Sequence, residues 1–305
     1  MSNSKGIISI VGHTAVDHLM RVPSFPAQNH SALISERHTD FGGGAANIAA
    51  GIVRLGEPCT LISAVGSDFF GSEYDRWMTT LGIQRQFFIR SDLPTPAAFV
   101  FTDLAGNQIT YFDWGASQAF SEEEAPALPF VHLATADPGF NLRVAEKSTF
   151  SSFVPGQDLH RYTKEQLAGM LEHIDILFAN HHEVEGMCRI LHLRKEQIVE
   201  SVPVVIITRG AEGSVLHEGG ITERIPAIPV QMVDPTGAGD SYQAGFLTAY
   251  VRGYSTLDCC RVGAVTASFV VEHRGGQTHL PTWDEVMQRY RTNFREIPNA
   301  ASRRF

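Results

Sequence analysis

The sequence predicts a three-layer α/β/α domain with a mostly parallel central sheet and a small β-sheet lid. Its 305 residues suit one large domain with an appendage. In the second half, short apolar runs alternate with helical segments, which is typical of βαβ units. Two turn-rich segments in the first half do not follow that alternation. We therefore expect one domain over residues 1–305, with a lid formed by insertions at about 13–40 and 94–115.

The strands of the central sheet are predicted from apolar, mostly β-branched runs that turn residues bound. In chain order they cover residues 6–12, 60–65, 130–133, 148–153, 174–179 and 204–208. Between the first two lies FGGGAANIAAGIVRLG, residues 41–56, in which glycines precede a helix of small residues. Gly56 is expected to end that helix, because glycine is a frequent helix terminator.

The lid is predicted from two local patterns. Residues 31–39 alternate in part between apolar and polar types, which indicates a half-exposed strand. Residues 98–102 and 108–112 flank the turn DLAGN, which predicts a β-hairpin. These pieces have no core of their own, so the lid must pack on the main domain, on a substrate or on a second lid.

The composition argues against several classes of protein. A net charge of −9 and the lack of a basic stripe argue against a nucleic-acid partner. The four cysteines form no C-x-x-C pair, which argues against a zinc ribbon or a disulfide scaffold. No stretch approaches the roughly 20 apolar residues that span a bilayer, and the first residues lack a signal-peptide pattern. We therefore expect a cytoplasmic protein without a membrane partner.

The most specific motif is DPTGAGD, residues 234–240, followed by a helix with apolar residues at helical spacing. At a helix start the first N–H groups lack intrahelical partners, so Gly237, Ala238 and Gly239 can form an anion hole for a phosphoryl group. Asp240 can then accept a proton from an attacking hydroxyl. The alternative is a tight turn with an acidic cap. Neither a Walker A loop nor a protein-kinase loop is present.

A candidate magnesium site follows the strand at 174–179. Asn180 and Glu183 stand at the carboxyl end of that strand and could hold Mg²⁺ and its waters. The alternative is an ordinary helix start with an acidic first turn. His181 and His182 lack the i, i+4 spacing of a zinc helix, so we expect them to be solvated.

A candidate nucleotide-binding turn follows the strand at 204–208. Thr208, Arg209, Gly210 and Gly213 lie in this turn, where the glycines would let the chain pass close to ATP and the arginine could meet phosphate. Taken by itself, the segment is better interpreted as a plain turn between two strands.

Candidate acceptor-binding residues lie near the N-terminus. Asp17 follows the first strand, at the ligand edge of an α/β sheet, and could accept two vicinal hydroxyls. Gly43, Gly44 and Asn47 head the first helix, where glycine admits a polyol and the amide can both donate and accept. The alternatives are an Asx turn and close helix packing. A dinucleotide fingerprint is excluded, because the glycines come about thirty residues too late.

Taken in this order, the motifs resemble the ribokinase-like (PfkB) family of sugar and nucleoside kinases over residues 6–285. Gly43, Gly44 and Asn47 are similar to its first signature, and residues 234–240 match its second, D-x-x-G-A-G-D. Asn180 and Glu183 resemble its N-x-x-E motif, and Thr208 and Gly210 its Thr-x-Gly turn. Longer stretches, such as GHTAVDH, PGQDL and GGQTHLPTWD, look most like the broad-specificity nucleoside kinases of archaea and some bacteria.

The resemblance implies a ribokinase-like fold, the donor ATP, the cofactor Mg²⁺ and a homodimer that pairs through the β lids. It implies that Asp240 deprotonates the ribose 5′-hydroxyl and that Asp17, Gly43 and Asn47 hold the ribose. A monovalent cation, K⁺, near Asp234 is a further implication. One departure is Val154, where relatives commonly carry Asp before Pro155.

These residues are compatible with three functions. The preferred one is a nucleoside kinase acting on inosine, guanosine, adenosine or cytidine, and the alternative is a sugar kinase of the ribose or fructose type. A nucleobase needs an aromatic slot, which Phe112, Trp114 and Phe101 could supply unless they are the packing face of the lid. A binding protein without catalysis would need a broken motif, and all the motifs are intact.

Overall fold

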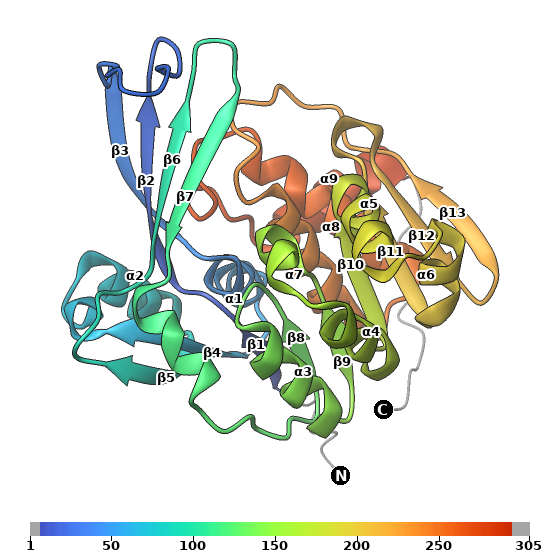
Figure 1. The fold of residues 1–305 in the computed structure, drawn as a ribbon. Helices are drawn as coiled ribbons and strands as arrows, with labels where there is room; N and C mark the ends of the chain where they lie inside the picture. The colour runs from blue at the N-terminus through green and yellow to red at the C-terminus, as the bar shows by residue number, and fades with distance from the viewer. Residues whose placement is uncertain (1–6, 295–305) are drawn as a thin grey trace.

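The computed structural model describes residues 7–294 and consists of a central sheet between two helical layers, with a smaller sheet at one side (Figure 1). The central sheet has the strand order β13-β12-β11-β10-β9-β8-β1-β4-β5. From β11 to β5, each pair of adjacent strands is parallel. At the other edge, β12 pairs antiparallel with both β11 and β13. The predicted α/β/α fold is confirmed. The prediction of one domain over 1–305 also includes residues 1–6 and 295–305, which lie outside the described residues.

Six strands of the central sheet lie at the predicted apolar runs, whereas β5, β12 and β13 were not predicted. Val204–Thr208 has the predicted bounds, and Ile8–Val11 lies within the predicted range. The full set is β1 (Ile8–Val11), β4 (Cys59–Gly66), β5 (Gln84–Arg90), β8 (Val131–Leu133), β9 (Ser151–Phe153), β10 (Ile176–Asn180), β11 (Val204–Thr208), β12 (Ser214–Glu218) and β13 (Ile221–Ile225).

The helices divide between the two faces of the sheet and enclose two apolar clusters. One face is covered by α1 (Gly44–Arg54), α2 (Glu73–Leu81), α7 (Ala238–Val251), α8 (Thr256–Val270) and α9 (Trp283–Phe294). The other is covered by η2 (Gly115–Ser121), α3 (Pro138–Lys147), α4 (Lys164–His173), α5 (His181–Leu191) and α6 (Lys195–Ser201). Gly56 has a left-handed φ of 93° directly after α1, as expected of a terminator.

The smaller sheet, called the lid below, has the order β3-β2-β6-β7 and stands beside the main body (Figure 1). It consists of β2 (Ala15–Arg21), β3 (Glu36–Gly42), β6 (Ala97–Thr102) and β7 (Gln108–Asp113). The predicted hairpin is the antiparallel pair β6–β7. The strand predicted at 31–39 begins only at Glu36, because its partner β2 ends at Arg21, which pairs with Glu36.

Helices α7 and α8 pack unusually closely. A Cβ at Gly245 of α7 would overlap the Thr266 hydroxyl, and a Cβ at Gly263 of α8 would lie 2.7 Å from the Tyr242 carbonyl oxygen. Only glycine permits the two backbones to approach this far. Since α7 begins at the DPTGAGD motif, this packing fixes the direction in which its N-terminus points.

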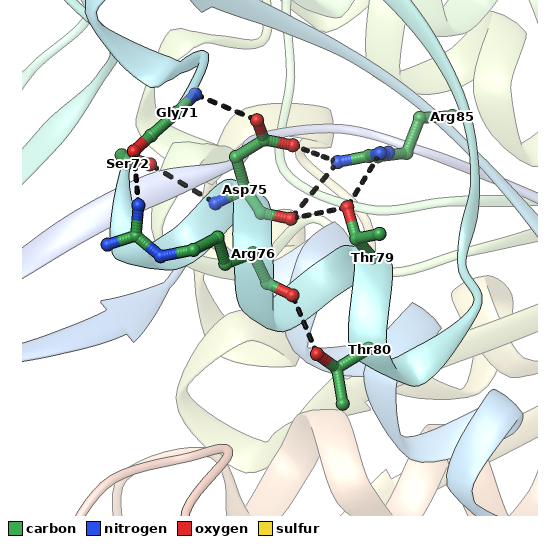
Figure 2. A network of polar contacts seen from close by, with 7 residues as sticks. All are labelled: Gly71, Ser72, Asp75, Arg76, Thr79, Thr80 and Arg85. Atoms are coloured by element: carbon green, nitrogen blue, oxygen red, sulfur yellow. Dashed lines mark hydrogen bonds and ion pairs between the residues drawn. The ribbon is translucent and has the colours of Figure 1, made fainter.

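The N-terminus of α2 carries a polar network that connects it to β5 (Figure 2). The Asp75 carboxylate accepts from the Gly71 backbone N–H at 2.8 Å and from Arg85 Nη1 at 2.6 Å. The Ser72 hydroxyl caps the helix by accepting from the Asp75 N–H. These donors and the Arg85 charge lower the pKa of Asp75, so its charged form stabilises the fold.

No helix within residues 7–294 combines the length and the apolar character needed to cross a membrane. The cytoplasmic location stays a prediction.

Candidate active site

A cavity of about 870 Å³ lies where the lid meets the carboxyl ends of the parallel strands. Five neighbouring strands, β11, β10, β9, β8 and β1, each end at this cavity, as expected for a ligand site in an α/β sheet. It brings together most of the predicted site residues. These are Asp17, Gly43, Gly44, Asn47, Phe112, Trp114, Asn180, Glu183, Thr208, Gly237, Gly239 and Asp240.

Asp240 lies in the first turn of α7 and lines the cavity. Its Oδ2 accepts a hydrogen bond of 2.8 Å from Asn47 Nδ2 of α1. Burial raises the pKa of Asp240 to about 6, and the bond from Asn47 opposes that rise. A carboxyl group with this pKa is ionised at neutral pH and remains basic enough to accept a proton.

The start of α7 leaves three N–H groups available to a ligand. Among the described residues, the backbone N–H groups of Gly237, Gly239 and Asp240 have no hydrogen-bond partner, whereas that of Ala238 donates to the Pro235 carbonyl at 3.1 Å. A Cβ at Gly239 would meet no atom within 4 Å, so space for an anion lies above it. Ala238 was predicted to be part of the anion hole, but its N–H is engaged and it does not line the cavity.

Asp17 on β2 faces Asp240 across the cavity. Burial, the Asp240 charge and the Asp40 charge raise the pKa of Asp17 to about 7. A Cβ at Gly42 would overlap the Asp17 carboxylate, so this glycine makes room for the side chain. No motif in the sequence indicated Gly42, because its role depends on pairing between β2 and β3.

Asn180 and Glu183 form the N-terminal cap of α5. The Asn180 N–H and Nδ2 donate to the two carboxylate oxygens of Glu183 at 2.9 and 2.8 Å, and Asn180 Oδ1 accepts from the Glu183 N–H. Burial raises the pKa of Glu183, and the Asp240 charge raises it further. Both residues line the cavity. Both Glu183 oxygens already accept from Asn180, and residues 7–294 hold no cluster of three or more His, Cys, Asp or Glu side chains that could hold a metal ion, so a cation beside them would be held mainly through its waters.

The predicted nucleotide turn is only partly at the cavity. Thr208 lines it beside Asn180, its partner in the β10–β11 ladder. Arg209, Gly210 and Gly213 do not line it, and they form the turn between the antiparallel strands β11 and β12. The Arg209 Nε donates to Glu212 at 2.9 Å, so phosphate binding by Arg209 would require this ion pair to open.

Asp234 also lies outside the cavity lining. Its Oδ1 accepts from the Thr236 N–H at 2.9 Å and its Oδ2 from the Gly275 N–H at 3.0 Å. In this structure it connects the loop before α7 to the loop at 275–277. A cation near Asp234 stays a prediction.

The aromatic predictions divide between the two faces of the lid. Phe112 and Trp114 line the cavity, together with Ala98, which pairs with Phe112. Phe101 points to the opposite face, because side chains alternate along β6, and its ring contacts Tyr111. The prediction that Phe101 could help to bind a nucleobase is therefore wrong, because its side chain lies on the outer face of the lid.

The aromatic slot has polar support that no sequence motif indicated. The centroid of the His13 ring lies 4.9 Å from that of the Phe112 ring and 4.8 Å from that of the Trp114 ring. Its Nε2 donates to the buried Asp158 carboxylate at 3.0 Å, and its Nδ1 lies 2.7 Å from the Ser117 hydroxyl. His13 and Asp158 are 145 residues apart, so only the fold brings them together.

Two further residues complete this wall. The Arg161 guanidinium lies 3.8 Å from the Trp114 ring centroid, a cation–π contact. Val154, where relatives were expected to carry Asp, is buried and lines the cavity.

Comparison with known proteins places this geometry in a family. The model of the pfkB family carbohydrate kinases matches residues 7–283. The chain is 45% identical over 289 residues to a nucleoside kinase of Methanocaldococcus jannaschii, covering 92% of this chain and 96% of that protein. It is 44% identical over 301 residues to a nucleoside kinase of Methanothermobacter thermautotrophicus, covering 95% and 97%.

Solved structures agree with this result. The crystal structure of the M. jannaschii nucleoside kinase matches with a TM-score of 0.90 and 44% identity, covering 94% of this chain and 99% of that one. The Burkholderia thailandensis nucleoside kinase in complex with inosine matches with a TM-score of 0.88 and 27% identity, covering 96% and 99%. The chain therefore belongs to the pfkB family of carbohydrate kinases, and it is a phosphotransferase with an alcohol group as acceptor.

Proposed function

We propose that this chain is an ATP- and Mg²⁺-dependent nucleoside kinase that phosphorylates the ribose 5′-hydroxyl of inosine, guanosine, adenosine or cytidine. One observation carries the proposal: a single cavity holds the Asp240 carboxylate at a helix N-terminus and the aromatic side chains of Phe112 and Trp114, whose rings meet edge to face with centroids 6.4 Å apart. A nucleobase can stack on such a ring, whereas a free sugar has no flat group to do so. The names of the relatives and the inosine complex of one of them support the same acceptor class.

Asp240 acts as the general base. Its carboxylate accepts the proton of the 5′-hydroxyl as the oxygen attacks the γ-phosphorus, and the bond to ADP breaks on the opposite side. The N–H groups of Gly237, Gly239 and Asp240, together with the dipole of α7, stabilise the charge on the transferring group.

The ribose lies between Asp17 and the start of α1. The Asp17 carboxylate accepts from the vicinal hydroxyls, and these donors favour its ionised form although its pKa is raised to about 7. Gly43 and Gly44 allow close approach, and Asn47 contributes amide contacts.

Asn180 and Glu183 would hold Mg²⁺, through its waters, beside Thr208. When bound, the ion neutralises phosphate charge. Gly210 and Gly213 form the outer edge of the proposed ATP site, and Arg209 would reach phosphate there only if its ion pair with Glu212 opened. Asp234 belongs to a proposed K⁺ site.

Homodimerisation through the lids is part of the proposal. The outer face of the lid leaves Phe99, Ile109 and Tyr111 exposed at 36%, 39% and 64%. Large apolar side chains gathered on a sheet face are typical of an interface. Light scattering on the purified protein would test it, and a monomeric mass at micromolar concentration would contradict it.

ADP release in a coupled assay, with MgATP and a panel of nucleosides and sugars, tests the acceptor class. Turnover of nucleosides with ribose and fructose inert is expected. Turnover of free sugars alone would favour the ribose- or fructose-kinase alternative and would leave the base and the anion hole in place.

The role of Asp240 needs a separate test. Asp240→Asn keeps the size of the side chain and should retain nucleoside binding in calorimetry, while kcat falls by roughly 10²–10⁴-fold. Unchanged turnover would remove Asp240 as the base.

A further inference from the structure

A chain of buried hydrogen bonds extends from α2 to the catalytic carboxylate. The Gln277 side chain is 4% exposed, and its Oε1 accepts from Trp77 Nε1 at 3.0 Å. Its Nε2 donates to Asn47 Oδ1 and to the Tyr74 hydroxyl, both at 2.8 Å. Asn47 Nδ2 in turn donates to Asp240 Oδ2 at 2.8 Å. Four elements of the structure, α2, the 275–277 loop, α1 and α7, therefore meet in one network.

The chemistry of Trp77 fixes the direction of every bond in this chain. An indole N–H can donate but cannot accept, so the Gln277 oxygen must face Trp77. The Gln277 amide nitrogen must then face Asn47, which requires that Asn47 present its oxygen to Gln277. Only the Asn47 amide nitrogen remains to face Asp240. The Tyr74 hydroxyl supports the same direction, because it donates to the Gly42 carbonyl and therefore accepts from Gln277 Nε2. Without both the indole and this hydroxyl, the Gln277 amide could rotate by half a turn, because the two ends of an amide have nearly the same shape.

The loop that carries Gln277 is held against the same site. Gly276 lies so close to Gly237 that a Cβ on Gly237 would come within 2.6 Å of the Gly276 Cα. Asp234 accepts from the Gly275 N–H at 3.0 Å. The backbone around Gln277 is thus fixed relative to the start of α7, which limits how far its side chain can move.

We propose that Trp77 and Gln277 are positioning residues that hold the Asn47 amide in the orientation in which it donates to Asp240. This inference rests on the proposed role of Asp240 as the base. An N–H donor favours the ionised carboxylate, which is the form able to accept a proton.

The orientation of Asn47 matters because, within residues 7–294, no cationic side chain is found to act on the pKa of Asp240. The titratable groups that interact with Asp240 are Asp17 from β2, Glu183 from α5 and Tyr74 from α2. Two of these are carboxyl groups, which disfavour a further negative charge. If the Asn47 amide turned round, its oxygen would also face the carboxylate, and the charged base would lose its one amide donor.

The variant Gln277→Glu tests this direction of bonding. An ionised glutamate can accept from Trp77 but has no N–H for Asn47, so Asn47 should turn its amide nitrogen toward it and its oxygen toward Asp240. The pKa of Asp240 should then rise, so the acidic limb of the pH profile of kcat should move to higher pH by about one unit or more. At pH values below this limb, kcat should fall about tenfold. Trp77→Phe removes only the indole donor from the network and should move the limb in the same direction by a smaller amount.

Tyr74→Phe is the matched control. It removes a hydroxyl that accepts from the same Gln277 nitrogen and donates to the Gly42 carbonyl at 2.8 Å, but the Trp77–Gln277–Asn47 chain keeps its direction. It should lower the melting temperature without moving the acid limb. If Gln277→Glu and Trp77→Phe fold and keep the wild-type limb, or if Tyr74→Phe moves the limb equally, the positioning role is refuted and the network is only structural.

A measurement without turnover separates this inference from the proposed function. The carboxyl stretch of Asp240 can be followed against pH by infrared difference spectroscopy, with Asp240→Asn as the reference. An upward shift of its titration in both Gln277→Glu and the uncharged variant Gln277→Leu supports the positioning role even if no nucleoside is phosphorylated, in which case only the proposed function fails. A shift in Gln277→Glu alone would be the direct effect of the added charge and would overturn the positioning role. An unshifted titration in folded Gln277→Glu overturns the positioning role even if nucleosides are turned over.

Discussion

Replacing Asp17 with Asn should stabilise the protein and impair the enzyme. Burial and the charges of Asp240 and Asp40 raise the pKa of Asp17 from 3.8 to about 7. Between pH 3.8 and about pH 7, Asp17 keeps its proton in the native state but has released it in the unfolded chain. The free energy of unfolding therefore falls as the pH rises through this range. Asn removes the negative charge and keeps the shape of the side chain.

The size of the effect follows from the shift. Each pKa unit corresponds to about 1.4 kcal/mol, so the shift sets an upper bound of about 4 kcal/mol for the destabilisation at pH 8. An amide placed in the same site also loses some hydration, so we expect a net gain of about 1–3 kcal/mol. The KM for nucleoside should rise roughly 10²-fold, because hydrogen bonds to a charged acceptor contribute about 1.5–3 kcal/mol each.

Urea denaturation of the wild type and of Asp17→Asn at pH 8 and pH 4 tests this expectation. The variant should be more stable at pH 8, and the two proteins should converge at pH 4, where Asp17 is protonated in the native state. Asp75→Asn serves as a control of opposite sign, because its carboxylate is stabilised by Gly71 and Arg85 (Figure 2). It should destabilise the protein at pH 8, with a smaller effect as the pH falls through the lowered pKa of Asp75.

The reasoning would be refuted if Asp17→Asn were no more stable than the wild type at pH 8. It would also be refuted if the gain in stability were the same at both pH values, since the stabilisation would then not come from the titration of Asp17.

Three other predictions concern the same cavity. Gly42→Ala should raise the nucleoside KM at least tenfold and leave the ATP KM within about twofold, because the new Cβ would overlap the Asp17 carboxylate. An unchanged nucleoside KM in steady-state kinetics would contradict this prediction. Arg209→Ala should leave the ATP KM within about twofold because the guanidinium is paired with Glu212, and a tenfold rise would show that it leaves that partner for phosphate. The acid limb of kcat/KM should reflect the Asp17–Asp240 pair with apparent pKa values between about 6 and 7, and a limb near pH 4 in a coupled assay would contradict the buried carboxylates.

The sequence was sufficient for six of the strands in the central sheet and for the motifs that act locally. The strand at 204–208 was predicted with its observed bounds, because a short β-branched run is typical of a strand that is buried on both faces. The start of α7 at the DPTGAGD motif was predicted for a similar reason, since glycines and an acidic residue before apolar helical spacing mark a helix N-terminus.

Contacts between distant parts of the chain could not be predicted. Gln277 lies in GGQTHLPTWD and Asp158 in PGQDL, two stretches that resemble relatives, yet neither residue carried a chemical role on the basis of spacing. Their partners are Asn47 and His13, 230 and 145 residues away, and only strand order brings them together. The prediction that Ala238 belongs to the anion hole failed for a local reason, because its N–H donates to the Pro235 carbonyl.

The close packing of α7 on α8 bears on how this enzyme can evolve. Gly245 and Gly263 each contact the facing helix, so almost any substitution at these two positions would displace α7, which carries Asp240. The interface between α7 and α8 therefore tolerates little variation. Phe112 and Trp114 lie instead on the lid and the segment that follows it, where a changed side chain alters only the shape of the slot. New acceptors can therefore be acquired through the lid while the phosphate-transfer chemistry is inherited unchanged.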